Sequence, residues 1–184
     1  MAVASFARKG GEAGPTPKAS LLLPWLWLAA AALIAQVLVI QGIGRTHGGA
    51  QLLPYLVPAA HALLLPFLLR NLSLWGIRLV LAGLLLNLTV MCLNGGLMPV
   101  DGSAVAAVGR HDAAELQLGA PIEGTKNIYL DSDDIRLHAL ADVIILPLPA
   151  PLTRAASAGD LLILPGVVLA FGEVARRGFR NRYR

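Results

Sequence analysis

The sequence predicts an all-α integral membrane protein, a four-helix transmembrane bundle with a small extracytoplasmic cap between its third and fourth helices. Two observations lead to this fold class. The 184 residues are 56% hydrophobic and only 14% charged, whereas a soluble domain carries about a quarter charged residues. The charges are also segregated along the chain, and apolar stretches of membrane-spanning length lie between them.

Four apolar stretches are expected to cross the bilayer. Residues 21–40 contain no charge and match the length of about 20 residues that spans about 30 Å of hydrocarbon. Residues 52–69 contain three prolines, which membrane helices tolerate when neighbouring groups satisfy the freed carbonyls. Residues 77–93 form the third stretch. The fourth, residues 159–175, is short and interrupted by Pro165 and Gly166, so an interfacial helix remains the alternative for it.

The charge distribution predicts the orientation. Short cytoplasmic loops carry the excess of lysine and arginine, and three segments are basic here: residues 1–20, residues 70–78 and the tail 176–184. Residues 97–158, which we call the cap segment, hold eight acids and four bases. Four crossings therefore place both termini in the cytoplasm and the cap segment outside. We expect residues 1–20 to be a disordered cytoplasmic segment leading into an uncleaved signal anchor, with a cleaved signal peptide as the alternative.

The cap segment is too short for an enzyme with a large core of its own. Its pattern predicts a helix over residues 103–118 with Ser103 as N-cap, and an extended stretch at 127–130. A turn at 131–133 is expected to start a second helix. Three prolines from Pro147 onward indicate an extended path. Ser157 and Asp160 have the spacing of a capping box at the start of the fourth helix.

The chain resembles a bacterial family of membrane proteins known as domain of unknown function 5317. The resemblance covers about residues 20–175 and implies a multi-span membrane domain, without a reaction, substrate or cofactor. One departure is Ala141, where the pattern has glycine. The matching residues are Asn94-Gly95-Gly96, Met98-Pro99, Lys126-Asn127, Leu137, Leu140, Asp142, Ile144, Pro147, Pro149, Ser157 and Gly159-Asp160.

Several polar residues are candidates for function or for structural bonding. His61 and Asn87 lie within apolar stretches. An ionisable group such as His61 at such a position is by default a functional hypothesis. We favour a structural hydrogen bond to a neighbouring helix for both residues, and for His61 the expected partner is Asn87 or Gln36. Asp142 lies between apolar runs and would need a partner if buried. Lys126, Arg136 or Arg154 could pair with it, and such a pair would fix the cap segment onto the bundle.

The stretch Asn94 to Pro99 is interpreted as the end of the third helix. Gly95 or Gly96 can adopt the positive φ of a helix C-cap, Asn94 can bond the last free carbonyls, and Pro99 prevents continuation. Met98 can pack against the bundle. A binding site in the crevice between residues 94–102 and 142–151 remains the alternative reading.

No catalytic, cofactor-binding or metal-ligating set is predicted. Asp131, Asp133 and Asp134 lack the further oxygen ligands that calcium needs, and Ser157 is better explained as a helix cap than as a nucleophile beside Lys126. The sequence therefore favours a non-enzymatic accessory or scaffold protein of the bacterial cytoplasmic membrane. A small-molecule or ion-handling protein that uses His61, Asn87 and the crevice is one alternative, and a membrane-embedded enzyme at the outer interface is another. The expected partners are the lipid bilayer and another membrane protein, with no nucleic acid and no cofactor.

Overall fold

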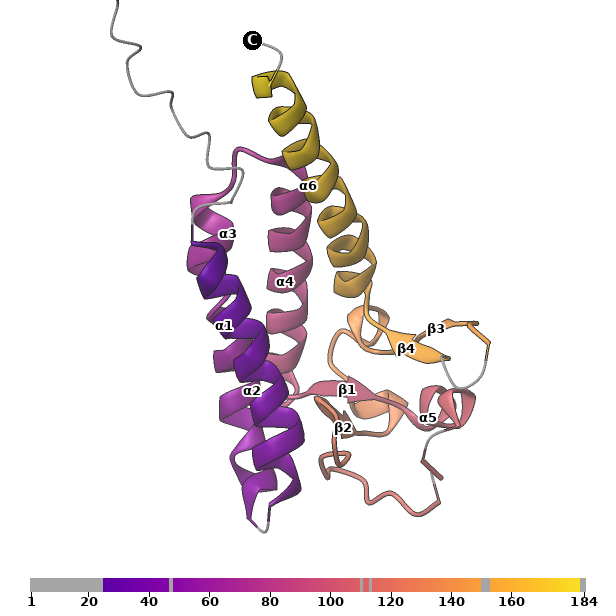
Figure 1. Ribbon diagram of the computed structural model, residues 1–184. Helices are drawn as coiled ribbons and strands as arrows, with labels where there is room; N and C mark the ends of the chain where they lie inside the picture. Colours follow the sequence, from indigo (N-terminus) through magenta and orange to yellow (C-terminus); the bar gives the residue numbers. More distant parts are fainter. Residues whose placement is uncertain (1–24, 47, 110, 113, 150–152, 183–184) are drawn as a thin grey trace, which may run out of the picture.

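The computed structural model describes residues 25–46, 48–109, 111–112, 114–149 and 153–182 (Figure 1). The predicted N-terminal segment 1–20, the start of the first apolar stretch and the last two residues of the tail lie outside this part of the chain. The described part is mostly helical, and four helices are long and apolar enough to cross a membrane. They run over Leu26–Arg45, Leu53–Arg70, Trp75–Leu93 and Ala158–Phe179.

The first two of these helices are interrupted. α1 (Leu26–Val37) continues as a π-helical turn, η1 (Leu38–Gly42), and a 3₁₀ turn, η2 (Ile43–Arg45). A further 3₁₀ turn, η3 (Gly49–Gln51), leads into α2 (Leu53–Ala62), and α3 (Leu65–Arg70) follows. Pro66 lies in the first turn of α3, where its missing N–H would have had no helical partner. The proline therefore begins a new helix instead of breaking one.

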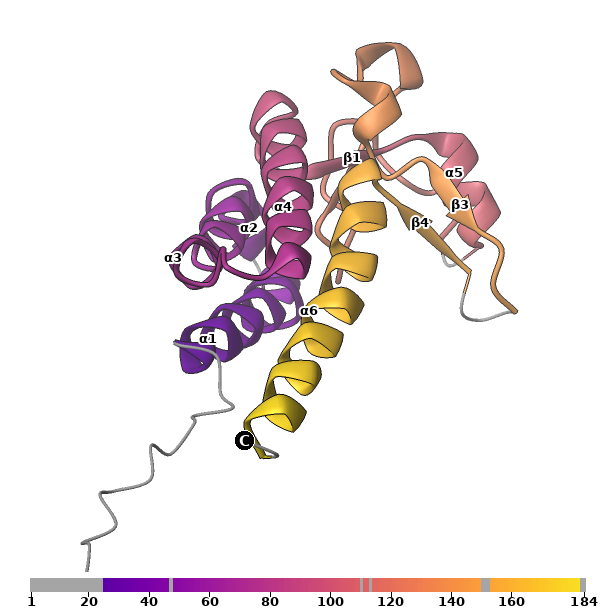
Figure 2. The same cartoon turned by 90° about the horizontal axis from the view of Figure 1, so that it is seen from above.

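The central feature is an antiparallel pair, α4 (Trp75–Leu93) and α6 (Ala158–Arg182), which lie side by side in Figures 1 and 2. α6 runs unbroken through Pro165 and is longer than the short, interrupted stretch that the sequence predicted. The first turn of α4 is held from α6: the backbone N–H groups of Trp75 and Gly76 donate to the Glu173 carboxylate at 3.2 and 3.0 Å. A carboxylate at this end also complements the helix dipole.

Glycines bring the two helices into close contact. α4 contributes Gly76 and Gly83 and α6 contributes Gly159 and Gly166, and the members of each pair are seven positions apart. A Cβ at Gly76 would overlap the backbone of Gly166 and Ala170, and a Cβ at Gly83 would overlap the carbonyl of Gly159. Small residues of this kind let membrane helices approach closely.

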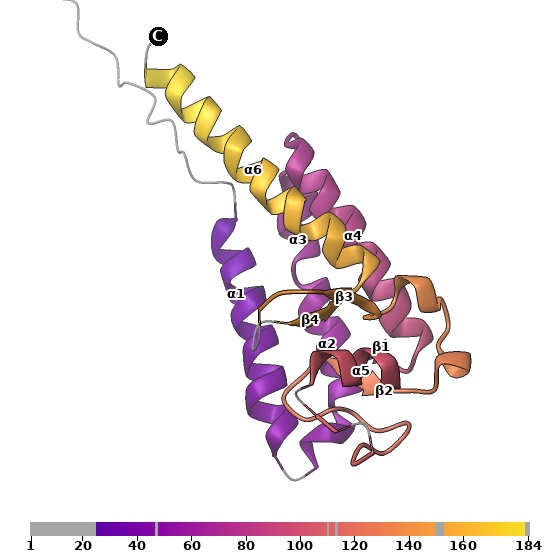
Figure 3. The same ribbon diagram turned by 90° about the vertical axis from the view of Figure 1, so that its right-hand side faces the viewer.

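The cap segment contains short strands as well as helical turns, so the all-α expectation is incomplete. β1 (Met98–Val100) pairs in parallel with β2 (Asn127–Tyr129), and β3 (Ile144–Leu146) pairs antiparallel with β4 (Arg154–Ala156). The strands lie beside one helix, α5 (Gly102–Val108), at the end of the bundle where α4 ends (Figure 3). The extended stretch expected at 127–130 therefore contains a strand.

Two predicted helices of the cap segment are wrong. The helix expected over 103–118 ends at Val108, since Gly109 adopts φ 66° there, and its N-cap is Asp101 in place of Ser103. Asp101 accepts a hydrogen bond from the Ala104 N–H at 2.8 Å. The helix expected after residue 131 is reduced to two 3₁₀ turns, η4 (Ser132–Asp134) and η5 (His138–Leu140). Within the expected extended path after Pro147, residues 150–152 lie outside the described part.

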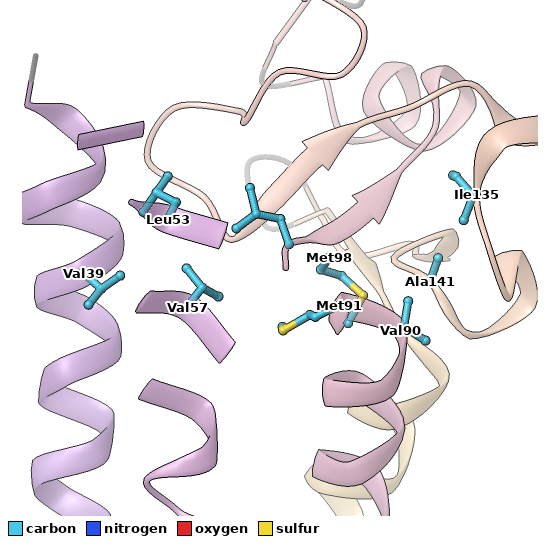
Figure 4. Close-up of a cluster of buried hydrophobic side chains, with 9 residues drawn as sticks. Val39, Leu53, Val57, Val90, Met91, Met98, Ile135 and Ala141 are labelled. Atoms are coloured by element: carbon cyan, nitrogen blue, oxygen red, sulfur yellow. The ribbon is translucent and has the colours of Figure 1, made fainter. Parts of the chain in front are cut away.

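A buried apolar cluster joins the cap segment to the helices. Figure 4 shows its side chains extending from η1, α2, α4 and the cap segment. Val90 and Met91 from the last turns of α4 are fully buried against Leu97 and Met98, which begin the cap segment. The cluster comprises Val39, Leu53, Val57, Val90, Met91, Leu97, Met98, Ile135 and Ala141.

Candidate functional site

Lys126 makes ionic contacts with both the cap segment and the bundle. Its Nζ lies 3.5 Å from Oδ2 of Asp142, which is in the cap segment, and 3.5 Å from Oδ2 of Asp160, which is in the first turn of α6. The Asp142 side chain is only 5% exposed and that of Lys126 is 23% exposed. Of the three bases that the sequence offered as partners for Asp142, the described structure pairs it with Lys126.

The start of α6 forms the second part of the site. Ser157 and Asp160 make the reciprocal bonds of a capping box: the Asp160 N–H donates to Ser157 Oγ at 3.0 Å, and the Ser157 N–H donates to Asp160 Oδ2 at 3.2 Å. Asn87 of α4 joins both residues. It accepts from Ser157 Oγ at 2.8 Å and donates to Asp160 Oδ1 at 2.9 Å. The hydroxyl of Ser157 is completely buried and already bonded, so it is unsuited to nucleophilic attack.

Asp142 is held from three directions. Its Oδ2 accepts from Asn127 Nδ2 at 2.8 Å in addition to its contact with Lys126. Its backbone N–H donates to the Pro99 carbonyl at 3.2 Å. The other carboxylate oxygen, Oδ1, is buried and has no hydrogen-bond partner among the described residues.

The charges of the site compensate one another incompletely. Asp142 and Asp160 carry one negative charge each when ionised and Lys126 carries one positive charge, which leaves a net −1. Burial raises the pKa of Asp142 above its ordinary value, because Lys126 and Asn127 offset only part of the desolvation. Burial alone would lower the pKa of Lys126, but the two carboxylates outweigh it and raise that pKa. Lys126 therefore remains charged at neutral pH.

The Asn94 to Pro99 stretch is the hinge between α4 and the cap segment. Asn94 Nδ2 donates to the Val90 carbonyl at 2.8 Å, as expected for a helix end. It also donates to the Arg136 carbonyl at 2.9 Å and accepts from the Arg136 N–H at 2.9 Å. Gly95 and Gly96 both have positive φ, and a Cβ at Gly96 would overlap the Pro54 carbonyl. Pro99 lies in β1 and Met98 is buried.

His61 does not make the bond expected from the sequence. Its Nδ1 contacts the Val57 carbonyl of its own helix at 2.8 Å, and no bond to Asn87 or Gln36 is present. Gln36 Nε2 instead donates to the Ala60 carbonyl at 3.5 Å. His61 is thus separate from the hydrogen-bonded network of Lys126, Asp142 and Asp160.

A second buried acid was missed as a candidate. Asp101 Oδ1 accepts from the Ser103 hydroxyl at 2.6 Å, and Oδ2 lies 2.9 Å from His138 Nε2. Burial by itself would raise the pKa of Asp101, but the bonds from Ser103, Ala104 and His138 outweigh it and lower that pKa. The residue types in Asp-Gly-Ser-Ala are a recognisable helix start; the contact with His138, 37 residues later, has no sequence signal.

A cavity of about 390 Å³ lies between η1, at the end of the first long apolar helix, and the cap segment. Its lining includes apolar residues, among them Ile40, Val100 and Val105, and the polar residues Lys126, Asn127 and Asp142. Within the described residues, no group of three His, Cys, Asp or Glu side chains is placed to hold a metal ion.

No curated protein and no solved structure matches this chain. A family model matches residues 20–171, which is most of the chain. These residues include α1 to α5, the Lys126 site and the first half of α6. The chain therefore belongs to DUF5317, a family of unknown function.

Proposed function

We propose that the chain is a multi-pass membrane protein with both termini in the cytoplasm and the cap segment outside. The charge distribution supports this orientation: the cap segment has eight acids against four bases, whereas the tail from residue 176 has five arginines and no acid. The geometry agrees with it. In Figure 1 the C-terminal end of α6 and the α3–α4 connection lie at one end of the bundle, away from the cap segment.

Single-cysteine labelling tests the orientation. In a Cys92→Ser background, Ser132→Cys places a thiol on the exposed surface of the cap segment, and Ser73→Cys places one on the exposed α3–α4 connection. A membrane-impermeant maleimide added to intact cells should label the first variant and label the second only after lysis. The opposite pattern would refute the orientation.

The proposed role is that of a non-enzymatic platform, which presents the cap segment to another membrane protein. One observation carries it: Lys126 contacts Asp142 and Asp160 together, so the cap segment is fixed to the first turn of α6. The neighbouring polar groups act in the same way, since Ser157, Asn87 and Asn127 bond to one another or to the two acids. A buried ionic group contributes little net stability on average, so its value lies in fixing one orientation.

The contacts of Lys126 with Asp142 and Asp160 are tested by removing the Lys126 charge alone and then together with the Asp142 charge. Lys126→Met leaves two carboxylates unpaired, and breaking a buried pair costs about 3–5 kcal/mol. Lys126→Met with Asp142→Asn removes one of those charges as well, so the double variant should recover part of the loss. Unfolding of purified protein in mixed micelles measures both. Equal stability of the wild type and Lys126→Met would remove the argument for fixation.

The platform role is tested by photo-crosslinking in cells. Leu118 and Leu137 are exposed on the cap segment, with 57% and 46% of their surface accessible, and Phe171 is an exposed α6 residue of similar apolarity at 74%. A photoreactive residue at either cap position should give a protein adduct of one defined mass. The same residue at Phe171 should give lipid adducts. Lipid adducts, or none, from both cap positions would refute the role.

A further inference from the structure

The cavity beside the Lys126 site has features that are not needed to fix the cap segment to the bundle. Its volume of about 390 Å³ falls in the range of about 300–1,000 Å³ found for small-molecule sites. One part of its lining is an apolar wall from Val100, Ala104, Val105 and Ile122, which belong to a single buried cluster. The lining also contains Asp142, together with the basic residues Lys126 and Arg154. The cavity therefore combines an apolar wall with charged groups of both signs.

Asp142 has unused capacity to accept hydrogen bonds. Its Oδ2 is bonded by Asn127 and paired with Lys126, but its buried Oδ1 has no partner among the described residues. A buried polar atom left unpaired costs about 1–3 kcal/mol, and native proteins keep such atoms mainly where function uses them. The raised pKa of Asp142 has the same origin, since too little positive charge and too few donors compensate its burial.

The chemistry of the missing partner follows from charge and from donor count. The two aspartates and Lys126 sum to −1, so a partner that carries +1 makes the site neutral. A hard metal ion requires about six or more oxygen ligands, and one free carboxylate oxygen does not provide them. A protonated amine supplies both a positive charge and N–H donors, and an apolar stem on that amine would match the wall formed by Val100 and Val105.

We propose that this cavity binds a primary ammonium group on an apolar stem, with the ammonium on Asp142 Oδ1 and the stem along Val100 and Val105. Lys126 does not oppose the ammonium, because two carboxylates already neutralise it. Arg154 also lines the cavity, but it pairs with Leu146 in the β3–β4 hairpin, four residues beyond Asp142. Arg154 is an exposed residue, so water and salt screen its charge. This site is additional to the platform role and does not depend on it.

Two sources could supply the ammonium group. Ile40 and Gln41, near the end of the first span, line the cavity, so an aminophospholipid headgroup could reach it from the bilayer. A free amine could reach it from the aqueous side. The two sources share the same interaction with Asp142 and differ in whether lipid composition affects binding.

The test uses the full-length protein in nanodiscs and three ligands of equal length: hexylamine, hexanol and hexanoate. Calorimetry should detect hexylamine binding that is at least tenfold tighter than that of either other ligand. Asp142→Asn should weaken hexylamine binding at least tenfold, whereas Asp134→Asn, at an exposed acid outside the cavity lining, should leave it unchanged. Val108→Trp should also abolish binding, because it fills the cavity without altering its charge. Val108 is only half-buried, so this variant is expected to fold.

Lipid composition separates the two sources. If the natural ligand is a headgroup, nanodiscs that contain phosphatidylethanolamine should weaken hexylamine binding relative to phosphatidylglycerol alone; equal binding in both indicates a free amine. Affinity should fall on acidification as Asp142 is protonated. The other charged or titratable groups of the site and the cavity lining are Lys126, Asp160, His111 and Arg154. A His111→Gln background removes the contribution of the histidine to the pH dependence of binding. Equal binding of hexylamine and hexanol, or no amine binding in phosphatidylglycerol, would overturn the proposal and leave Asp142 Oδ1 bonded by water.

Discussion

Adding one methyl group at Gly76 should separate the two central helices. An ideal Cβ at this position would overlap the Gly166 carbonyl oxygen and the Ala170 nitrogen, and it would lie 2.7 Å from Ala170 Cα. All three are backbone atoms of α6, so no side chain can rotate away. α4 and α6 would have to move apart along their contact, which would also strain the bonds from Trp75 and Gly76 to Glu173.

The magnitude follows from the opposed effects of the methyl group. Overpacking of a well-packed site costs about 1–3 kcal/mol, whereas replacing a helical glycine by alanine otherwise gains about 0.5–1 kcal/mol. Gly172→Ala is the matched control, because it lies in α6 and its Cβ would meet nothing within 4 Å. Both variants gain the same helical term, so Gly76→Ala should be less stable than Gly172→Ala by about 1–3 kcal/mol, which is the overpacking cost alone.

Reversible unfolding by SDS in mixed micelles, followed by circular dichroism, measures this difference. Gly83→Ala should behave like Gly76→Ala, since its Cβ would overlap the Gly159 carbonyl. Equal unfolding midpoints for Gly76→Ala and Gly172→Ala would show that α4 and α6 are not in backbone contact, and the close glycine packing would then be wrong.

Three further outcomes are expected. Asn94→Ala should lower the free energy of unfolding by about 2–3 kcal/mol, because the backbone N–H and carbonyl of Arg136 lose their partner; Thr89→Ala, at an exposed hydroxyl, should change it by less than about 0.5 kcal/mol. Glu173→Ala should cost about 1 kcal/mol through loss of the cap on α4, and an unchanged midpoint would contradict that contact. The folded-state pKa of Asp101 is lowered, so its stabilising contribution is present above the unfolded-state pKa and is lost as pH falls through the folded-state pKa. Asp101→Asn should therefore flatten the acid side of a pH–stability curve, and an unaltered slope would refute this assignment.

Sequence reasoning identified the candidate residues more completely than it identified the contacts between them. The local pattern indicated Asp142, Ser157 and Asp160. Lys126 was offered as one partner of Asp142, and Asn127 was named only through the family resemblance. Only the capping box of Ser157 and Asp160 could be assigned as a contact, because its partners are three residues apart. The contact between Lys126 and Asp142 spans 16 positions of irregular chain, and sequence reasoning could offer it only as one of three pairings.

The two wrong helices have different causes. The helix expected over 103–118 satisfied the apolar spacing, but Gly109 adopts a left-handed conformation and ends it. The helix expected after residue 131 was replaced by two 3₁₀ turns. There the Arg136 backbone bonds to Asn94, 42 residues away. Such bonds satisfy backbone groups that a helix would otherwise pair internally, and local pattern gives no indication of them.

The sequence by itself determined the four long apolar stretches, the acidic cap segment between the last two, and the segregation of charge, because these depend on composition along a continuous stretch of chain. Only the tertiary structure decided that Gly76 and Gly83 face Gly166 and Gly159 and that Lys126 lies between two aspartates. It also decided that Asp142, which lines a cavity, has one oxygen to which no described residue bonds. The physical reason is that these features are set by how close distant backbones approach, and that distance is a property of the packed helices and strands together.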